Sequence, residues 1–170
     1  MNDTQQPPFI IKPLSYETLP QAQALRDRVF ANEIETIEKD LLLASLDPQK
    51  YKDIYQQNEI TTLHYWVLQE MNTRKVIGLT GIYTETDDDT CWLGWFCIDT
   101  NQRNLGLGKQ FLNFSIHRAT FMKKKYLHIY TKKEKKFSSA IALYEKFGFV
   151  SYTLKNRKYS KKIYFKKKLQ

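Results

Sequence analysis

Residues 91–131 hold the sequence pattern that most constrains how this chain can fold. A run of aromatic and other apolar residues at 91–99 predicts a strand. A polar loop with two glycines follows, apolar residues at helical spacing predict a helix over 108–124, and 126–131 predicts a second strand. A strand, a helix and a strand in this order require a crossover between parallel strands, and such crossovers are right-handed in nearly all proteins.

The strands before this crossover are predicted to pair antiparallel. Residues 63–69 and 76–84 are rich in β-branched and aromatic residues, and turns rich in Asn, Thr and Asp separate them from each other and from 91–99. We therefore predict an α/β (α+β) fold: a mixed, mostly antiparallel twisted sheet with flanking helices and one central βαβ crossover. The pattern also predicts a short strand at 9–13, helices from about 19 and over 34–47, a loop or short helix at 49–60, a helix at 138–147 ended by Gly148, and strands at 149–154 and 162–168.

The size of the chain suits one domain. The 170 residues and the apolar fraction of 42% predict a single domain spanning residues 1–170. No apolar run reaches the roughly 18 residues that a membrane span needs. The polar start of the chain lacks the pattern of a secretory signal, so the expected compartment is the cytoplasm.

The two cysteines fit neither a disulfide nor a metal site. Cys91 and Cys97 lie on one predicted strand, roughly 20 Å apart, whereas a disulfide needs Cα atoms within about 7 Å. They lack metal-ligand spacing, and His64, His117 and His128 do not cluster in the sequence. We expect buried thiols, no covalent cysteine intermediate and no metal.

The net charge of +9 is compatible with three kinds of partner: nucleic acid, an anionic membrane surface or an anionic small ligand. The lysines concentrate late in the chain, at 123–125, 132–136 and 155–168. No helix-turn-helix, zinc-finger or RNA-binding signature accompanies them, which disfavours nucleic acid. A membrane partner is not expected either.

The loop over 98–109 has the chemistry of an anion site. Gly106 and Gly108 let the backbone turn tightly and approach a ligand closely. Free N–H groups at the start of the following helix, with the helix dipole behind them, attract negative charge. Arg103 and Lys109 add positive charge to the same loop. The glycine spacing matches neither the phosphate loop of NTPases nor a dinucleotide fingerprint. A pyrophosphate fits this arrangement.

A second motif, about 30 residues downstream, gives this loop a context. The loop pattern Arg/Gln-x-x-Gly-x-Gly/Ala is matched by Arg103, Gly106 and Gly108. The downstream pattern Ala-x-x-Leu-Tyr-x-x-x-Gly-Phe is matched by Ala140, Leu143, Tyr144, Gly148 and Phe149. Together the two segments resemble the GNAT superfamily of acyl-CoA N-acyltransferases. The resemblance implies an enzyme that moves an acyl group, expected to be acetyl, from acetyl-CoA directly to a primary amine.

The resemblance assigns CoA binding to the loop and to the strand before it. The pyrophosphate would be held, mainly by backbone N–H groups, by Arg103, Asn104, Leu105, Gly106, Leu107, Gly108 and Lys109. The pantetheine arm would pair with the strand end formed by Phe96, Cys97 and Ile98. It would lie in a V between this strand and 126–131, where one of the strand's N–H groups would polarise the thioester carbonyl.

Tyr144 is the implied general acid that protonates the departing thiolate. A phenol with a pKa of about 10 can donate to a thiolate whose conjugate acid has a pKa of about 8.5, more readily as negative charge builds on sulfur. The alternative role for Tyr144 is packing against CoA or within the core.

The general base is less defined. Some members of the family use a glutamate on the strand before the loop, but Trp92 stands there and 91–98 contains no carboxylate. Glu85, at the end of the preceding strand, is one candidate, acting directly or through water. Asp99, which also suits a loop-structuring role, and His64 are others. A chain of water molecules without a single base is a fourth option.

The helix that carries Tyr144 also departs from the pattern of the GNAT family. Many relatives have a cofactor-contacting Asn where this chain has Phe137. Ser138 or Ser139 is expected to substitute, unless the contact is absent. The lysines at 132–136 either reach the 3′-phosphate of CoA or form a solvated loop.

The acceptor side is the least constrained part of the chain. Four strand aromatics either wall an aromatic acceptor pocket or fill the core: Trp66, Tyr83, Trp92 and Trp95. The acidic turn at 85–89 either attracts a cationic amine or is simply solvated. The alternative to an enzyme is a GNAT-like protein that binds acyl-CoA in a regulatory or interaction role. The residues identify neither the acceptor amine nor the oligomeric state, for which a homodimer is one option.

Overall fold

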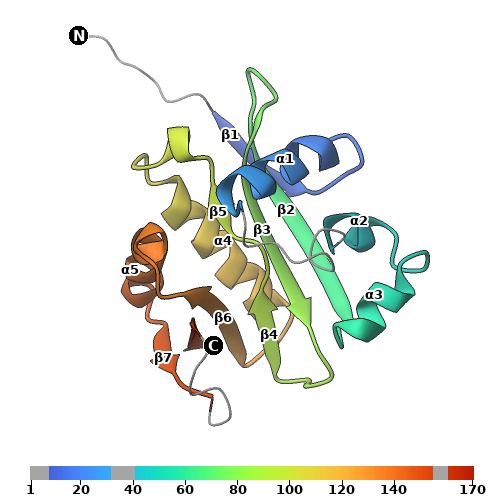
Figure 1. Cartoon of the computed structure of the whole chain (residues 1–170), viewed down its shortest axis with the longest axis vertical. Helices are drawn as coiled ribbons and strands as arrows, with labels where there is room; N and C mark the ends of the chain where they lie inside the picture. The colour runs from blue at the N-terminus through green and yellow to red at the C-terminus, as the bar shows by residue number, and fades with distance from the viewer. Residues whose placement is uncertain (1–7, 32–40, 155–160) are drawn as a thin grey trace.

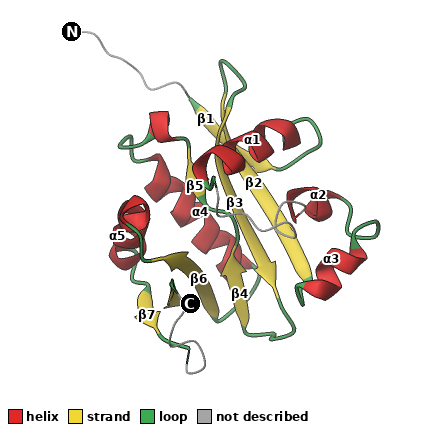
Figure 2. Cartoon of the chain, viewed as in Figure 1, coloured by secondary structure: helices red, strands yellow, loops and turns green. Residues whose placement is uncertain are grey.

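The computed structural model describes residues 8–31, 41–154 and 161–170. A single sheet organises them, with strand order β1-β2-β3-β4-β6-β8-β7 and with β5 paired to β3 (Figures 1 and 2). The strands are β1 Phe9–Pro13, β2 Thr62–Glu70, β3 Val76–Thr84, β4 Thr90–Leu93, β5 Cys97–Ile98, β6 Tyr126–Lys132, β7 Val150–Tyr152 and β8 Lys162–Lys168. The α-helices are α1 Leu19–Val29, α2 Leu41–Leu46, α3 Lys52–Gln57, α4 Leu107–Phe121 and α5 Ser138–Lys146.

The strand pairing confirms the predicted meander and crossover. β2, β3 and β4 pair antiparallel in chain order. Helix α4 then carries the chain to β6, which pairs parallel with β4. The other described pairings are antiparallel. The predicted fold class is therefore confirmed.

Alternating side chains build a core on each face of the sheet. Leu25 of α1 packs in one cluster with Val67 and Leu79. Leu112 of α4 packs in another with Ile82. Figure 1 shows α1 in front of the sheet and α4 behind it. The middle of the sheet is therefore buried on both sides, and its strand ends are where a ligand can approach.

The prediction of one continuous strand over 91–99 is wrong, because the structure divides it into β4 and β5 around Gly94. Both pieces pair with β3, and the Gly94 N–H donates to the carbonyl of Gly81 at 2.7 Å. A Cβ atom at Gly94 would lie 3.2 Å from the ring of Tyr65. A larger residue there would have to displace that ring, so the glycine allows the chain to cross it closely.

β4 and β6 separate in the middle of the sheet. Their parallel pairing covers three residue pairs and ends at Trp92 and His128. Beyond it, residues 129–132 of β6 pair with β8 on one side. The ladder with β4 does not extend to these residues. The result is an opening between the two strands, at the place where the family resemblance predicts a V.

The remaining elements differ from the predictions mainly at their ends. The second predicted helix is described from Leu41 onward, as α2, and residues 32–40 lie outside the described ranges. Residues 49–60 contain the short helix α3, and the strand predicted over 149–154 is shortened to β7. Among the described helices, none is both long and apolar enough to cross a membrane.

Candidate active site

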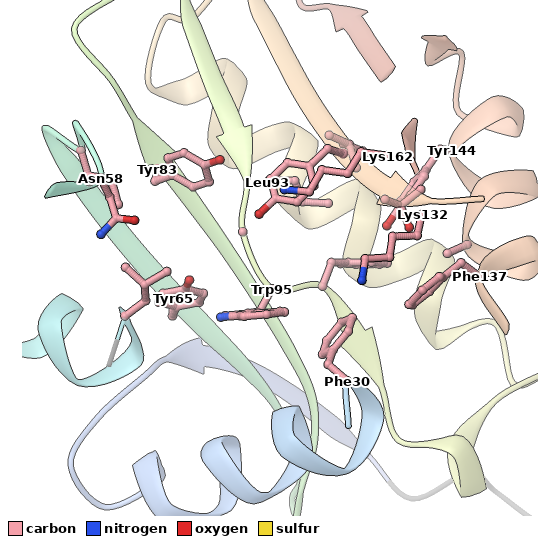
Figure 3. A pocket seen from close by; sticks show the side chains of 18 of the residues that line it. Phe30, Asn58, Tyr65, Tyr83, Leu93, Trp95, Lys132, Phe137, Tyr144 and Lys162 are labelled. Carbon is pink, nitrogen blue, oxygen red and sulfur yellow. The ribbon is translucent and has the colours of Figure 1, made fainter. Parts of the chain in front are cut away.

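A pocket with a volume of about 350 Å³ opens where β4 and β6 separate (Figure 3). Its aromatic lining residues are Phe30, Tyr65, Tyr83, Trp95, Phe96, Tyr130, Phe137 and Tyr144. Its charged lining residues, within the described part of the chain, are Glu85, Lys132 and Lys162. The pocket thus combines an aromatic wall with one carboxylate and two ammonium groups.

Tyr144 reaches this pocket from α5, a helix that ends just before Gly148, where a φ of 83° terminates it. The side chain is 4% exposed and packs against Phe96 and Phe165, with ring centroids 6.2 and 5.9 Å away. Burial, followed by the effect of Cys97, raises the pKa of Tyr144 above its ordinary value. The phenol is therefore protonated at neutral pH and can act as a proton donor.

Glu85 also lines the pocket and directly follows β3. Burial raises the pKa of its carboxyl group, the neighbouring charges of Glu59 and Asp87 raise it further, and a hydrogen bond from Trp92 opposes them. Ile82 lies opposite Leu93 in the sheet, and Glu85 is three residues, or about 10 Å, further along the chain. A carboxylate at that distance can receive a proton that is released near Leu93, a residue of the pocket lining, through water.

The glycine loop forms the start of α4 as predicted. Gly106 occupies the N-cap position with a φ of 77°, a left-handed conformation that glycine adopts without strain. Asn104 also has a positive φ, of 65°. A Cβ atom at Gly108 would lie 3.6 Å from Leu143, an ordinary contact, so the fold itself does not require glycine there.

The N-terminus of α4 carries the features of an anion site. The first N–H groups of an α-helix have no carbonyl partner within the helix, and no side chain caps them here. A hydrogen bond with Lys146, and repulsion from it, lower the pKa of Lys109, so two ammonium groups lie close to each other beside this end. The Arg103 side chain donates to the carbonyl of Ile98 at 3.4 Å, which orients it along the loop. Leu107 is buried and packs in the core cluster with Phe111.

The strand end before the loop divides between pocket and core. Phe96 lines the pocket, whereas Cys97 and Ile98 pair with β3 and are buried. Burial raises the pKa of Cys97 to about 12, and that of Cys91 to about 12 as well. Both thiols are free of disulfides, as predicted, and both are overwhelmingly neutral at physiological pH. Neither has the thiolate character of a nucleophile.

The other candidate bases lie elsewhere. Asp99 is 1% exposed, accepts from the Asn101 N–H and pairs with Arg28 at 2.9 Å, so it structures the loop. His64 lines a second, smaller cavity with Arg118. Of the four options for the base, Glu85 and water remain within the pocket.

Several predicted contacts are not part of the pocket. Ser138 is exposed and donates to the carbonyl of Lys135, while the preceding Phe137 lines the pocket. In the acidic turn, Asp89 pairs with Lys125 at 2.9 Å and Asp87 accepts from the Asp89 N–H. Asp87 and Asp89 are therefore engaged by the turn itself and by Lys125. Within the turn, only Glu85 lines the cavity.

The aromatic wall is partly as predicted. Tyr83 and Trp95 line the pocket. Trp92 stacks behind Tyr83, with centroids 6.3 Å apart, and Trp66 lies in the second cavity. The sequence interpretation placed 126–131 beside the gap but missed Phe30, from the end of α1, and Lys162 of β8. Only the spatial approach of distant segments brings these together. No group of potential metal ligands occurs among the described residues.

A helix start with a left-handed glycine, a buried tyrosine at a gap between parallel strands, and this strand order define the acyl-CoA-dependent acyltransferase class. Residues 61–151 match the acetyltransferase (GNAT) domain family, and the chain belongs to that family. It is therefore an acetyltransferase of the acyl-CoA N-acyltransferase type. No curated protein sequence matches the chain.

Solved structures share the whole fold. An acetyltransferase from Streptococcus agalactiae is 19% identical, covers 95% of this chain and 98% of its own, and has a TM-score of 0.73. A GNAT-family acetyltransferase from Staphylococcus aureus is 16% identical over 96% and 100% of the two chains, with a TM-score of 0.71. The ribosomal-protein-S18-alanine N-acetyltransferase from Escherichia coli is 17% identical over 95% and 93%, with a TM-score of 0.67.

Proposed function

We propose that this protein transfers the acetyl group of acetyl-CoA directly to a primary amine. The observation that carries this proposal is the position of Tyr144, a buried and protonated phenol in the pocket where β4 and β6 separate. A proton donor is needed at that place because the reaction releases a thiolate.

The start of α4 would hold the pyrophosphate of CoA. The exposed loop residues and the unpaired N–H groups after Gly106 offer donors to an anion, and Lys109 and Lys146 add positive charge. Gly108 leaves room for a phosphate close to the backbone. The pantetheine arm would then run past Phe96 into the gap beside residues 129–132 of β6.

The proposed reaction needs no covalent intermediate on the protein. The amine nitrogen attacks the thioester carbonyl carbon, a C–N bond forms, and the C–S bond breaks as its electron pair moves to sulfur. Tyr144 gives its proton to that sulfur. The protons that the amine loses pass through water to Glu85 and to solvent, and one of them is needed to restore the phenol. The products are an amide, free CoA and one proton.

Titration calorimetry with acetyl-CoA tests the donor site. We expect the wild type to bind with a dissociation constant in the micromolar range, which corresponds to about −8 kcal/mol. Gly108→Trp fills the space beside the helix start and is expected to abolish binding. Asn113→Trp, at an exposed position on the same helix, is the matched control and is expected to bind normally. A folded wild type that ignored acetyl-CoA would contradict the proposal.

Release of free CoA thiol in the presence of a panel of primary amines tests the transfer. Turnover supports an enzyme acting on amines. Binding of acetyl-CoA without turnover on any amine would instead support the alternative, a protein that binds acyl-CoA for a regulatory or interaction role.

A further inference from the structure

Aromatic side chains form a continuous row on one face of the sheet, across β3, β4, β6, β8 and β7. We call this row the aromatic face; its members are Tyr83, Trp92, His128, Tyr130, Tyr152 and Tyr164. Strand register places them together, because Tyr83 lies opposite Trp92, Trp92 opposite His128, Tyr130 opposite Tyr164, and Tyr164 opposite Tyr152. Directly opposed residues share a face.

This face points away from α4 and α5. Cys91 and Leu93 alternate with Trp92 along β4, and both belong to the core that contains Leu112 of α4 and Tyr144 of α5. Trp92 therefore points to the opposite side, and the rest of the row follows it. Except for Tyr164, the members are at least partly accessible, and Tyr130 is 37% exposed.

The rings contact one another without a break. Trp92 is the centre, with ring centroids 6.3 Å from Tyr83, 4.9 Å from His128 and 6.3 Å from Tyr130. Tyr164 continues the row, 6.2 Å from Tyr130 and 5.8 Å from Tyr152. The phenol of Tyr152 lies 2.6 Å from Nδ1 of His128, which fixes both rings. A surface of this kind offers flat, rigid contact area to a flat ligand group.

The aromatic face is continuous with the pocket. Tyr83 and Tyr130 line the cavity and belong to the row at the same time. Glu85 stands at the border, since it lines the cavity and accepts a hydrogen bond from the Trp92 indole. A ligand that reaches the gap between β4 and β6 therefore meets aromatic rings on the way.

Charge is distributed unevenly along this surface. Among the described residues that line the pocket, Glu85 is the single carboxylate, and it stands against the ammonium groups of Lys132 and Lys162. At the β8 end, the Lys162 ammonium lies 4.5 Å from the Tyr130 ring and that of Lys166 lies 5.6 Å from the Tyr152 ring. A cationic group is stabilised beside Glu85 and repelled near β8. The surface favours a ligand with one ammonium group and an uncharged body.

We propose that the acceptor is an aromatic primary amine with a single positive charge, whose ring packs on Tyr83 and Tyr130 and whose nitrogen lies at the gap between β4 and β6, from which Glu85 receives a proton through water. The inference rests on the proposed function, because it names the substrate class of the same site. It excludes polyamines and small polar amines as preferred acceptors.

Comparison of three amines tests this class: 2-phenylethylamine, 2-methoxyethylamine, which has the same ethylamine unit with a small polar body, and 1,4-diaminobutane, which carries a second charge. We expect kcat/KM for 2-phenylethylamine to exceed those for the other two at least about tenfold. An equal or higher value for either of the others overturns the inference.

Tyr83→Leu tests the aromatic contact while keeping an apolar side chain. We expect it to lower the preference for 2-phenylethylamine over 2-methoxyethylamine about two- to tenfold. Tyr16→Leu, at a residue that is 61% exposed and outside the pocket, is the matched control and is expected to keep the wild-type preference. A preference that Tyr83→Leu leaves unchanged contradicts the assigned ring position.

Calorimetric binding of the same amines to the protein saturated with CoA separates the two proposals, since it needs no turnover. If no amine releases thiol from acetyl-CoA but 2-phenylethylamine binds most tightly and Tyr83→Leu weakens it, the proposed function fails and the acceptor-site assignment stands. If thiol is released but 1,4-diaminobutane or 2-methoxyethylamine binds and reacts best, the assignment fails and the function stands.

Discussion

The guanidinium of Arg28, at the end of α1, lies 2.9 Å from the buried carboxylate of Asp99, which follows β5. Lys75 approaches the same carboxylate at 3.7 Å, and the backbone N–H of Asn101 donates to it. Asp99 thus joins the first helix and the β2–β3 turn to the segment that leads into the glycine loop. The pair connects α1, whose C-cap residue Phe30 lines the pocket, to the loop of the proposed CoA site.

We expect Asp99→Ala to lower the free energy of unfolding by about 1–3 kcal/mol, because it leaves the Asn101 N–H and Arg28 without their partner. Burial alone would raise the pKa of Asp99, but the Asn101 N–H, Arg28 and Lys75 outweigh it and lower the pKa. This stabilisation is present above the unfolded pKa, about 3.9, and is lost as the pH falls through the folded value. Chemical denaturation between pH 3 and pH 7 measures it. Glu17→Ala, in an exposed pair with Arg74 at 3.9 Å, is the control and is expected to be nearly neutral.

Tyr144→Phe removes the proposed proton donor and keeps the ring that packs on Phe96 and Phe165. We expect kcat to fall about 10²- to 10⁴-fold, with the affinity for acetyl-CoA and the melting temperature almost unchanged. Thiol-release kinetics and calorimetry check the two parts. A kcat within twofold of the wild type would assign Tyr144 to packing alone.

Glu85→Gln tests the proton acceptor through the pH profile. Because burial and the nearby carboxylates raise the pKa of Glu85, kcat/KM of the wild type is expected to decline on the acid side at a pH above the ordinary glutamate range. The variant should be slower and should lack this decline. The pH dependence of the free energy of unfolding that Glu85 contributes is opposite in direction to that of Asp99. A raised pKa gives stability that is lost as the pH rises through the folded value, so Glu85→Gln should not lower the melting temperature at pH 7. An unchanged acid limb would favour the water-chain alternative.

Gly106→Ala and Gly108→Ala are expected to affect stability in opposite directions. The φ of 77° at Gly106 costs an L-residue about 1–2 kcal/mol. Gly108 lies inside the first turn of α4 with ordinary space for a Cβ, so alanine there is expected to stabilise the helix by up to about 1 kcal/mol. Both changes should weaken acetyl-CoA binding if the backbone approaches a phosphate here. Thermal unfolding and calorimetry on the two variants distinguish the fold effect from the ligand effect.

Local patterns predicted most of the fold. The change from helical to strand periodicity at residue 63 and the glycine that ends α5 both reflect interactions within a few residues. Such interactions can be recognised directly in a sequence. The division of 91–99 around Gly94 was missed because it is a feature of the packed sheet, in which the ring of Tyr65, on another strand, passes Gly94 closely. A single glycine in an apolar run does not indicate such a neighbour.

The glycine loop at the start of α4 was predictable, and the wall of the pocket was not. Gly106 and Gly108 act through the geometry of their own backbone, so a short sequence motif is enough to recognise them. The pocket wall combines Phe30, Tyr83 and Tyr130, which lie on three separate elements, and their aromatic character alone is equally consistent with core packing. Trp66 shows the ambiguity, because it has the same character and lies in a different cavity.

The ladder between β4 and β6 ends after three residue pairs, which leaves a gap between the two strands beyond it. The amide groups of a pantetheine arm laid in that gap would complete the ladder, so that the substrate acts as a temporary strand. A sheet that its own substrate completes should melt at a higher temperature as acetyl-CoA is added, and the gain should be about 2.7 kcal/mol at a ligand concentration a hundred times the dissociation constant. Substrate supply in the cell would then determine the lifetime of this protein as well as its rate.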